Sequence, residues 1–496
     1  MSGSVGAGAL NLETLARVPA THRSALDPRA LSIGVVHLGL GVFHRTHQIS
    51  FLERAALESG ETCWGVSAYS ERSPAAAELL AAQDGLYSLR IAAPGATALT
   101  VLSSLREARF APGDPVLIER LCDPAVALVT LTVSEKGYRL DPSQRALARD
   151  DPELLADAAG RPPVTVVGQL VRGLEARARL GAPLSVVCCD NLAENGRLLA
   201  GLVADFATLP GARVDGGLAA YLESAVGFPS TVVDRISPAP GDADRAAAAR
   251  ALTVADAAAV VTEPFADWVI EDRFAGRRPA LERAGARLVD DVVPYAELKL
   301  RALNGTHSAI AWCGLLLGDG WVHETLARPP VARFVAALLS EEIGPSLAVP
   351  PGVDFASYAA SVTERLANPE LPYANTQVAS DSGQKLPGRI LSTVRACRAA
   401  GIAPRRCALA LACYLRVALS GRSDAGDPVD FPDGARERLS VAAAGAPSSA
   451  AAARRALSVR EVFAEDLGHD AVFVGLVGDA LEAITTHGLA AVLDAE

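Results

Sequence analysis

Short apolar runs and longer amphipathic segments follow one another through the first half of the chain. The apolar runs, rich in β-branched and aliphatic residues, predict strands at residues 31–38, 64–69, 127–133 and 184–189. The segments between them predict helices over residues 43–57 and 164–180. Strands that alternate with helices in this way predict an α/β fold with a parallel, doubly wound sheet.

The pattern changes near residue 297, after which alanine-rich helical segments dominate and strand signals are few. An alanine cluster at 440–457 is interrupted by glycine, proline and serines, which predicts two helices joined by a loop. Because 496 residues exceed one ordinary core, we predict two domains that meet near Asp290–Pro294. The first is an α/β domain over residues 1–293, and the second is a mostly α-helical domain over residues 294–496.

Composition narrows the choice of partner. The formal net charge of −11 provides no basic footprint for nucleic acid or an anionic membrane surface. The eight cysteines include no CxxC pair and no zinc-type Cys/His spacing. The start of the chain lacks a signal-peptide pattern, and no uncharged apolar run reaches the roughly 18 residues of a membrane span. We therefore expect a cytoplasmic protein that binds a small molecule, and neither nucleic acid nor membrane.

The first chemistry-bearing segment follows the first predicted strand. A strand, two glycines and a helix allow backbone N–H groups to approach a pyrophosphate, so Gly39, Gly41, Val42 and Phe43 are candidate cofactor-binding residues. His44 holds the position of the third glycine in the usual fingerprint, and a turn that serves packing alone is the alternative. His44 and a second histidine, at 47, lack a third metal ligand nearby, so we predict no metal site.

The residue that binds the adenosine ribose is expected near the end of the second strand. Glu71 and Arg72 lie there side by side. A carboxylate favours NAD, whereas an arginine accommodates the 2′-phosphate of NADP. We favour NAD and leave NADP open.

The second segment, KLRALNGTHSAIAW, places Lys299, Asn304 and His307 in one helical stretch. In an α-helix Asn304 and His307 are an i, i+3 pair on one face. Lys299 then lies about 140° from Asn304, at the edge of that face. The alternative is a solvated lysine with a satisfied histidine behind it.

Further polar residues follow predicted strands or turns. Each also has an ordinary structural explanation. Asn191 follows a strand, where an Asx turn is the alternative. Asp234 precedes Arg235, where a local ion pair is the alternative. Trp268 with Glu271 could form a pocket wall or a surface turn, and Lys385 is a substrate contact or a solvated loop residue.

Seven strings in this order resemble the polyol-specific long-chain dehydrogenases, a family that includes mannitol 2-dehydrogenases, arabinitol dehydrogenases and fructuronate reductases. The strings are VVHLGLGVFHRTHQ, TLTVSEKGY, CCDNLAENG, VDRISP, TEPFADWVIEDRF, KLRALNGTHS and SGQKLPGR. The resemblance implies a Rossmann-type N-terminal cofactor domain, a mostly helical C-terminal domain and metal-free hydride transfer with NAD(P). It also implies a monomer or weak oligomer that acts on a sugar alcohol or ketose.

The resemblance assigns a role to each matched residue. Lys299 matches the general acid/base, and Asn191 and Asn304 match the amides that hold the reacting oxygen. The remaining matches contact the substrate or pass its proton: His307 and Asp234 orient hydroxyls, Lys385 adds a contact, and Glu135 serves proton passage.

These roles make physical sense. A lysine accepts a proton from the alcohol only if its pKa falls from about 10.4 toward neutrality, and the flanking AIAWCGLLL run could supply the desolvation. Two fixed amides would stabilise the developing alkoxide by about 3 kcal/mol each.

Two departures from the family pattern point to different substrate classes. Family members often carry an arginine where this chain has Gln377 or Ala374, and its loss favours a neutral polyol over a sugar acid. The string QKLPGR is closer to the fructuronate reductases. We expect a mannitol-type polyol 2-dehydrogenase, with a fructuronate (mannonate) reductase as the alternative. A catalytically silent nucleotide-binding protein is the competing class.

Overall fold

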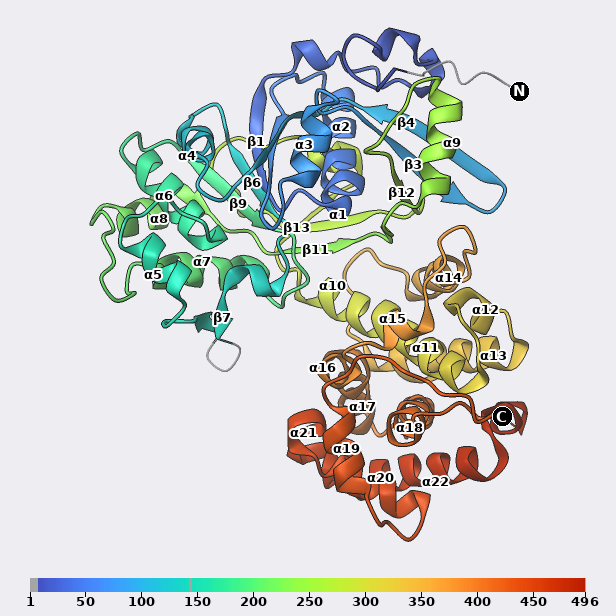
Figure 1. The fold of residues 1–496 in the computed structure, drawn as a ribbon. Helices are drawn as coiled ribbons and strands as arrows, with labels where there is room; N and C mark the ends of the chain where they lie inside the picture. Colours follow the sequence, from blue (N-terminus) through green and yellow to red (C-terminus); the bar gives the residue numbers. More distant parts are fainter. Residues whose placement is uncertain (1–7, 142–144, 496) are drawn as a thin grey trace. The chain divides into compact units, whose positions relative to one another are not determined.

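The computed structural model describes residues 8–141 and 145–495 and divides into two compact units, Met1–Val293 (unit 1) and Pro294–Glu496 (unit 2). Figure 1 shows strands and helices in unit 1 and helices in unit 2. This confirms the predicted fold class, an α/β Rossmann-type part followed by a mostly helical part.

Unit 1 is built around a six-stranded sheet whose strands are all parallel. In spatial order the strands are β10 (Val226–Gly227), β9 (Leu184–Cys188), β6 (Leu128–Leu131), β1 (Ile33–Leu38), β2 (Gly65–Ser70) and β5 (Leu105–Phe110). The four predicted strands are β1, β2, β6 and β9, so these predictions are confirmed. Their side chains are buried on both faces of the sheet, which explains the uninterrupted apolar runs.

Helices cover both faces of this sheet, because alternate strand residues point to opposite sides. Val36 and Leu38 pack with α4 (Pro115–Cys122), α6 (Val166–Ala178) and α7 (Asn195–Phe206). Val35 packs on the other face with α2 (Gln48–Ser59) and α3 (Ala75–Ala81). The remaining helices of unit 1 are α1 (Val42–Thr46), α5 (Pro152–Ala158), α8 (Leu218–Ala225) and α9 (Asp242–Leu252).

The helix predicted over residues 43–57 is two helices, because the chain bends at His47 between α1 and α2. The His47 ring lies against Phe43, Phe51 and Trp268, and its Nε2 is 2.8 Å from the Asp267 carbonyl oxygen. These tertiary contacts fix the bend, which a local pattern does not show.

Smaller sheets extend unit 1. One contains β12 (Val260–Thr262), β3 (Tyr87–Ala93) and β4 (Ala96–Leu102); another contains β11 (Thr231–Asp234), β13 (Asp267–Glu271) and β14 (Arg287–Val289); a third pairs β7 (Leu140–Asp141) with β8 (Ala146–Leu147). The hairpin β3–β4 is antiparallel, as is the pair β11–β13. The strand β11 ends at Asp234, one of the candidate substrate-binding residues.

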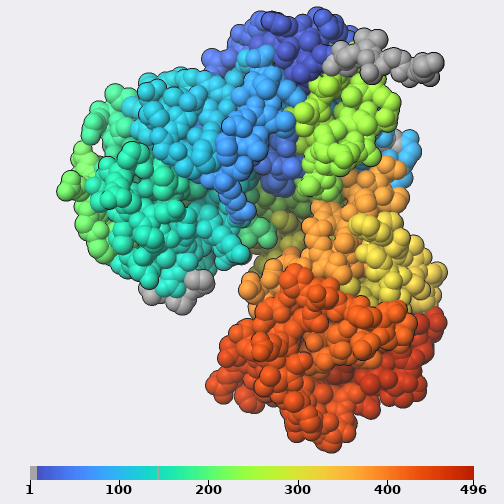
Figure 2. All heavy atoms as spheres, viewed as in Figure 1, coloured from blue at the N-terminus to red at the C-terminus, as the bar shows by residue number. Residues whose placement is uncertain are grey.

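Unit 2 packs its helices around α11 (Thr306–Leu317) and α18 (Arg405–Ser420), whose Trp312 and Tyr414 rings lie 5.3 Å apart. Its other α-helices are α10 (Val293–Leu298), α12 (Val322–Leu326), α13 (Pro329–Ala337), α14 (Phe355–Leu366), α15 (Asn375–Ala379), α16 (Ser382–Leu386), α17 (Ser392–Ala399), α19 (Arg436–Ala443), α20 (Ser449–Leu457), α21 (Arg460–Gly468), α22 (Ala471–His487) and α23 (Leu489–Ala495). The helices α19 and α20, joined by a loop, confirm the interpretation of the alanine cluster. In Figure 2 the segment coloured orange to red forms one continuous part of the unit's surface.

Three segments of unit 2 are π-helical: η6 (Lys299–Gly305), η7 (Leu338–Ile343) and η9 (Pro387–Leu391). Such segments are rare and often occur at functional sites. The first carries two of the candidate catalytic residues.

Among the helices of the described residues, none is by itself long and apolar enough to cross a membrane. Only the sharply bent pair α22–α23 meets the length and composition requirement together.

Candidate active site

Four candidate segments of unit 1 follow neighbouring strands of the parallel sheet, so they lie along the same edge. The glycine turn follows β1, the Ser134–Glu135 loop follows β6, Asp190–Asn191 follows β9 and Glu71 follows β2. The chain moves from β1 to β2 on one side and later places β6 on the other side. The strand order therefore reverses beside β1, where doubly wound sheets bind ligands.

The two glycines of the turn, Gly39 and Gly41, differ in backbone conformation and in the space that a Cβ would have. Gly39 adopts a φ of +99°, and a Cβ there would collide with the Thr132 carbonyl oxygen. A Cβ at Gly41 would meet only the Gly39 oxygen, at 3.7 Å, an ordinary contact. Packing therefore requires glycine at 39 but not at 41, so a glycine at 41 favours close approach of a ligand to the backbone.

His44 occupies the third position of the fingerprint because its ring stacks flat on His37, with centroids 3.3 Å apart and planes 7° apart. Both rings are buried, and burial lowers the pKa of His37 to about 3, so the pair is uncharged. The Thr130 and Thr132 hydroxyls lie 2.8 and 3.0 Å from the two His37 nitrogens. Within residues 8–141 and 145–495, no group of three His, Cys, Asp or Glu side chains could hold a metal ion.

Asp190 fixes the loop that carries Glu135. Its carboxylate accepts the Val133 N–H at 3.0 Å, the Ser134 N–H at 2.8 Å and the Tyr138 hydroxyl at 2.6 Å. These bonds hold Ser134 at a φ of +67° and leave the side chains of Glu135 and Asn191 exposed at the sheet edge. The sequence analysis named Asn191 and missed Asp190, although an acid directly after a buried strand was a visible signal.

Asn195 connects this edge to the strand that carries Asp234. Its amide donates to the Asp190 and Thr231 carbonyl oxygens at 2.9 and 3.1 Å, and its oxygen accepts the Thr231 N–H at 2.9 Å. Asp234 is the last residue of the strand β11 that begins at Thr231, and it is buried. The Asn195 side chain, together with the Thr231 hydroxyl that donates to the Cys188 carbonyl oxygen at 2.7 Å, therefore holds the β9 edge and the Asp234 strand together.

Two alternatives from the sequence are wrong. Arg235 does not pair with its neighbour Asp234; it donates to the Thr46 and Glu263 carbonyl oxygens. Trp268 forms neither a pocket wall nor a surface turn, because it is fully buried in the core.

Glu71 and Arg72 differ in their surroundings. Gln169 donates to one Glu71 carboxyl oxygen at 3.2 Å, while the other oxygen is buried without a hydrogen-bond partner. Burial raises the pKa of Glu71 to about 8. Arg72 is exposed and donates to the Ser134 hydroxyl at 2.6 Å.

In unit 2, the π-helical geometry corrects the predicted position of Lys299. An α-helix would place Lys299 and Asn304 about 140° apart, but a π-helix closes its turns between residues five apart. Since Lys299 and Asn304 are five apart within η6, they lie close to one turn apart, on the same side of the helix. The apolar run after His307 is the buried core of unit 2, which explains its lack of charge.

A second π-helix packs directly against the first. A Cβ at Gly305 would collide with the Arg389 carbonyl oxygen, and one at Gly388 would lie 2.8 Å from Leu300. This close approach brings the Arg389 guanidinium to the Asn304 carbonyl oxygen at 3.4 Å and the Ser308 hydroxyl at 2.9 Å.

His307 is half-buried, with its Nε2 atom buried, and three cationic side chains act on it. Its Nε2 has no hydrogen-bond partner, and the Tyr373 ring meets it edge-on at 5.5 Å. Burial lowers the pKa of His307 to about 3, with further lowering by Arg389, Arg365 and Lys385. The imidazole is therefore neutral, with a ring nitrogen available for a ligand hydroxyl.

Lys385 lies half-buried near this histidine. Its ammonium donates to the Ser380 carbonyl oxygen at 2.5 Å, and burial, followed by the charge of Arg389, lowers its pKa. The structure thus brings Asn304, His307 and Lys385 into one neighbourhood. The sequence analysis missed the arginines there because Arg365 lies far along the chain from His307.

Comparison with known proteins identifies the family. Residues 33–283 match the family model described as mannitol dehydrogenase Rossmann domain, and residues 291–485 match the mannitol dehydrogenase C-terminal domain. The D-mannonate oxidoreductase of Escherichia coli is 35% identical over 94% of this chain and 96% of its own length. A mannitol 2-dehydrogenase of Pyrenophora tritici-repentis is 32% identical over 93% of this chain and 81% of its own length. The Pseudomonas fluorescens mannitol 2-dehydrogenase, solved in ternary complex with NAD and D-mannitol, superposes with a TM-score of 0.82 at 30% identity, covering 98% of this chain and 99% of that one.

Proposed function

Because the chain belongs to the mannitol dehydrogenase family of oxidoreductases, we propose that it is an NAD-dependent polyol 2-dehydrogenase that interconverts a sugar alcohol such as mannitol and a ketose such as fructose. The observation that carries the proposal is the π-helix η6, which aligns Lys299 and Asn304 on one side. A proton acceptor and an amide donor in that alignment suit the removal of a proton from an alcohol oxygen.

The lysine content of the chain supports the role of Lys299. The sequence contains three lysines, Lys136, Lys299 and Lys385, among 46 Lys and Arg residues, so surface charge is supplied by arginine. An arginine remains protonated at any physiological pH, whereas a lysine can release and accept a proton. Because Lys299 is a lysine in a chain that otherwise uses arginine, its identity favours a role in acid/base chemistry.

The residues of unit 1 fit a dinucleotide. The space above Gly41 leaves the backbone N–H groups of Val42 and Phe43 open to a pyrophosphate, and the strand order reverses beside this turn. When bound, the nicotinamide accepts the hydride from the alcohol carbon. The buried, unpartnered oxygen of Glu71 suits a ribose hydroxyl, which favours NAD over NADP.

The remaining candidates hold the substrate and move its proton. In this proposal the amides of Asn191 and Asn304 bind the reacting oxygen of the substrate. Asp234 and His307 bind the neighbouring hydroxyls, because the neutral Nε2 of His307 can accept a hydrogen bond. Lys385 adds a donor, and the exposed Glu135 passes the proton of Lys299 to solvent. In the oxidation direction Lys299 takes the hydroxyl proton as the hydride leaves; in reduction it returns it.

A second function, the oxidoreduction of a sugar acid such as mannonate, is favoured by one observation. Arg365, Arg389 and Lys385 all act electrostatically on His307, and a carboxylate substrate would neutralise part of this charge. These arginines could replace the one that this chain lacks at Gln377 or Ala374.

The two functions are distinguished by a substrate panel of mannitol, arabinitol, sorbitol and mannonate, each with NAD and with NADP. We expect turnover of a neutral polyol with NAD. Turnover of mannonate alone would establish the second function, and no turnover with any pair would exclude both.

A further inference from the structure

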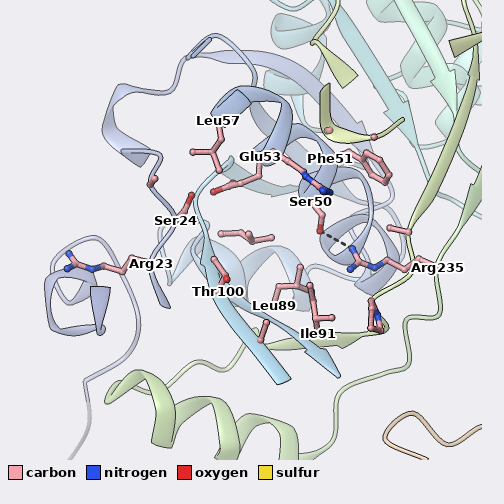
Figure 3. Close-up of a pocket in the computed structure, with 18 residues that line it drawn as sticks. Arg23, Ser24, Ser50, Phe51, Glu53, Leu57, Leu89, Ile91, Thr100 and Arg235 are labelled. Atoms are coloured by element: carbon pink, nitrogen blue, oxygen red, sulfur yellow. Dashed lines mark hydrogen bonds between the residues drawn. The ribbon is translucent and has the colours of Figure 1, made fainter. Parts of the chain in front are cut away.

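A cavity of about 480 Å³ opens in unit 1 between helix α2 and the hairpin β3–β4 (Figure 3). None of the candidate cofactor or substrate residues lines it. Its volume lies within the roughly 300–1,000 Å³ typical of small-molecule sites.

The walls of the cavity are largely aliphatic. Leu57 comes from α2, Leu89 and Ile91 come from β3, and Leu102 ends β4. Leu57 is 43% exposed, which is unusual for a leucine on a helix that otherwise buries its apolar side chains. An apolar ligand body would cover this side chain.

Positive charge in the cavity comes from Arg54 and Arg235; the side chain of Arg23 points away in Figure 3. The one lining carboxylate, Glu53, is already saturated, because it accepts the Ser104 N–H at 2.8 Å, the Ser104 hydroxyl at 2.5 Å and the Ser103 N–H at 3.1 Å. Glu53 therefore serves the fold and pairs with neither arginine.

The two arginines are held differently. Arg235 is only 8% exposed and donates to the Thr46 and Glu263 carbonyl oxygens and to Ser50, which leaves one of its five N–H groups uncommitted. Arg54 is exposed, and in the described part of the chain no carboxylate lies within ion-pair distance of it. Both arginines line the same cavity. Burial lowers the pKa of Arg235, Glu263 opposes that effect, and the charge of Arg54 adds a smaller lowering.

We propose that this cavity is a second small-molecule site that binds an organic acid with an apolar body. The carboxylate lies between Arg54 and the remaining donor of Arg235, and the apolar body lies along Leu57, Leu89 and Ile91. An anion relieves the repulsion of the two arginines, and the aliphatic wall favours a ligand with an apolar body over a purely ionic one such as phosphate. Binding at this cavity does not depend on the dehydrogenase reaction.

The test is isothermal titration calorimetry of the full chain with octanoate and with octylammonium. We expect octanoate to bind with a stoichiometry of one and octylammonium to give no saturable binding. Arg54→Glu should weaken octanoate binding at least tenfold by reversing the charge. Thr100→Phe should do the same by filling the cavity, since Thr100 lines it from β4.

The matched control is Arg250→Glu, an exposed arginine on α9 that does not line the cavity. It should bind octanoate as the wild type does. The proposal is contradicted if the wild type binds no octanoate, if octylammonium binds equally well, or if Arg54→Glu and Thr100→Phe both retain wild-type affinity.

Discussion

Individual buried polar atoms at the sheet edge and around η6 have no protein partner, and these atoms mark the candidate site most clearly. The Nε2 of His307 and one oxygen of Glu71 are of this kind, and an unpaired buried polar atom typically costs about 1–3 kcal/mol. A bound polyol or ribose would recover that cost. The fold therefore retains these atoms at the expense of stability, as expected where binding requires them.

Glu71 makes this cost measurable through pH. An acid whose folded pKa is about 8, against 4.5 ordinarily, holds its proton more tightly in the folded state. Its contribution is thus intact below pH 4.5, and stability is lost as pH rises toward 8. The free energy of unfolding of the wild type should therefore fall between pH 5 and pH 8.5. In Glu71→Gln this fall should be smaller by about 1–2 kcal/mol, allowing for partial solvent access.

Urea unfolding at the two pH values measures this difference. The exposed Glu119 on α4 provides the control substitution Glu119→Gln, because its side chain makes no ion pair or hydrogen bond among the described residues. Identical pH dependence in the wild type and in Glu71→Gln would show that Glu71 is not the titrating group.

At the scale of elements, the two π-helices η6 and η9 depend on glycine. Gly305→Ala should place a methyl group against the Arg389 carbonyl oxygen, separate η6 from η9 and destabilise the protein by about 1–3 kcal/mol. The kcat should fall more than the loss of folded protein explains, because Lys299 and Asn304 would lose their alignment. Thermal unfolding and kcat measure the two effects.

Gly475→Ala in α22 is the matched control, since a Cβ there meets nothing within 4 Å. It should leave kcat unchanged and stabilise the helix by about 0.5–1 kcal/mol. If Gly305→Ala behaved like Gly475→Ala, close packing of the π-helices would not matter for the site.

The loop that carries Glu135, which Asp190 holds in place, is a second positioning element. Asp190→Asn keeps the side-chain shape but removes the charge that accepts the bonds from Val133, Ser134 and Tyr138. We expect kcat to fall about tenfold while the KM for the polyol changes little, because the loop carries Glu135 rather than a substrate contact. Steady-state kinetics provide the measurement.

Asp205→Asn is the control for this change, because the Asp205 carboxylate also holds a backbone segment, the strand β8, by accepting the Leu147 N–H at 3.0 Å. It should lower stability and leave kcat intact. Equal kcat losses in the two variants would show that the effect is general loosening rather than positioning.

Sequence patterns predict elements well where one physical cause dominates. The strands β1, β2, β6 and β9 are buried on both faces, so their apolar runs were unambiguous. The π-helical form of η6 was not predictable, because an extra residue per turn leaves no mark on a short stretch of seven residues. The bend at His47 was equally hidden, since it depends on Trp268, far along the chain.

At the scale of the whole molecule, the proposed reaction requires residues from both units. Unit 1 carries the glycine turn, Asn191 and Asp234, and unit 2 carries Lys299, Asn304 and His307. The proposed proton-transfer residue and the candidate cofactor turn thus belong to separately packed units. A change at Lys299 should therefore abolish chemistry without weakening NAD binding.

The motifs in the sequence named the candidate residues of both units, but they did not reveal the surroundings of each residue. Arg365 and Arg389 act on His307 through packing of α14 and η9, which no linear pattern reveals. The substrate class depends on these surroundings, and this is why the sequence left two functions open.

The most direct measurement of the central claim compares Lys299→Arg with Lys136→Arg. Both substitutions keep a positive charge, but arginine cannot accept the alcohol proton at neutral pH. We predict that Lys299→Arg lowers kcat for polyol oxidation at pH 7 at least a thousandfold, with an unchanged Kd for NAD, and that Lys136→Arg retains wild-type kcat. Wild-type kcat in Lys299→Arg would contradict the account.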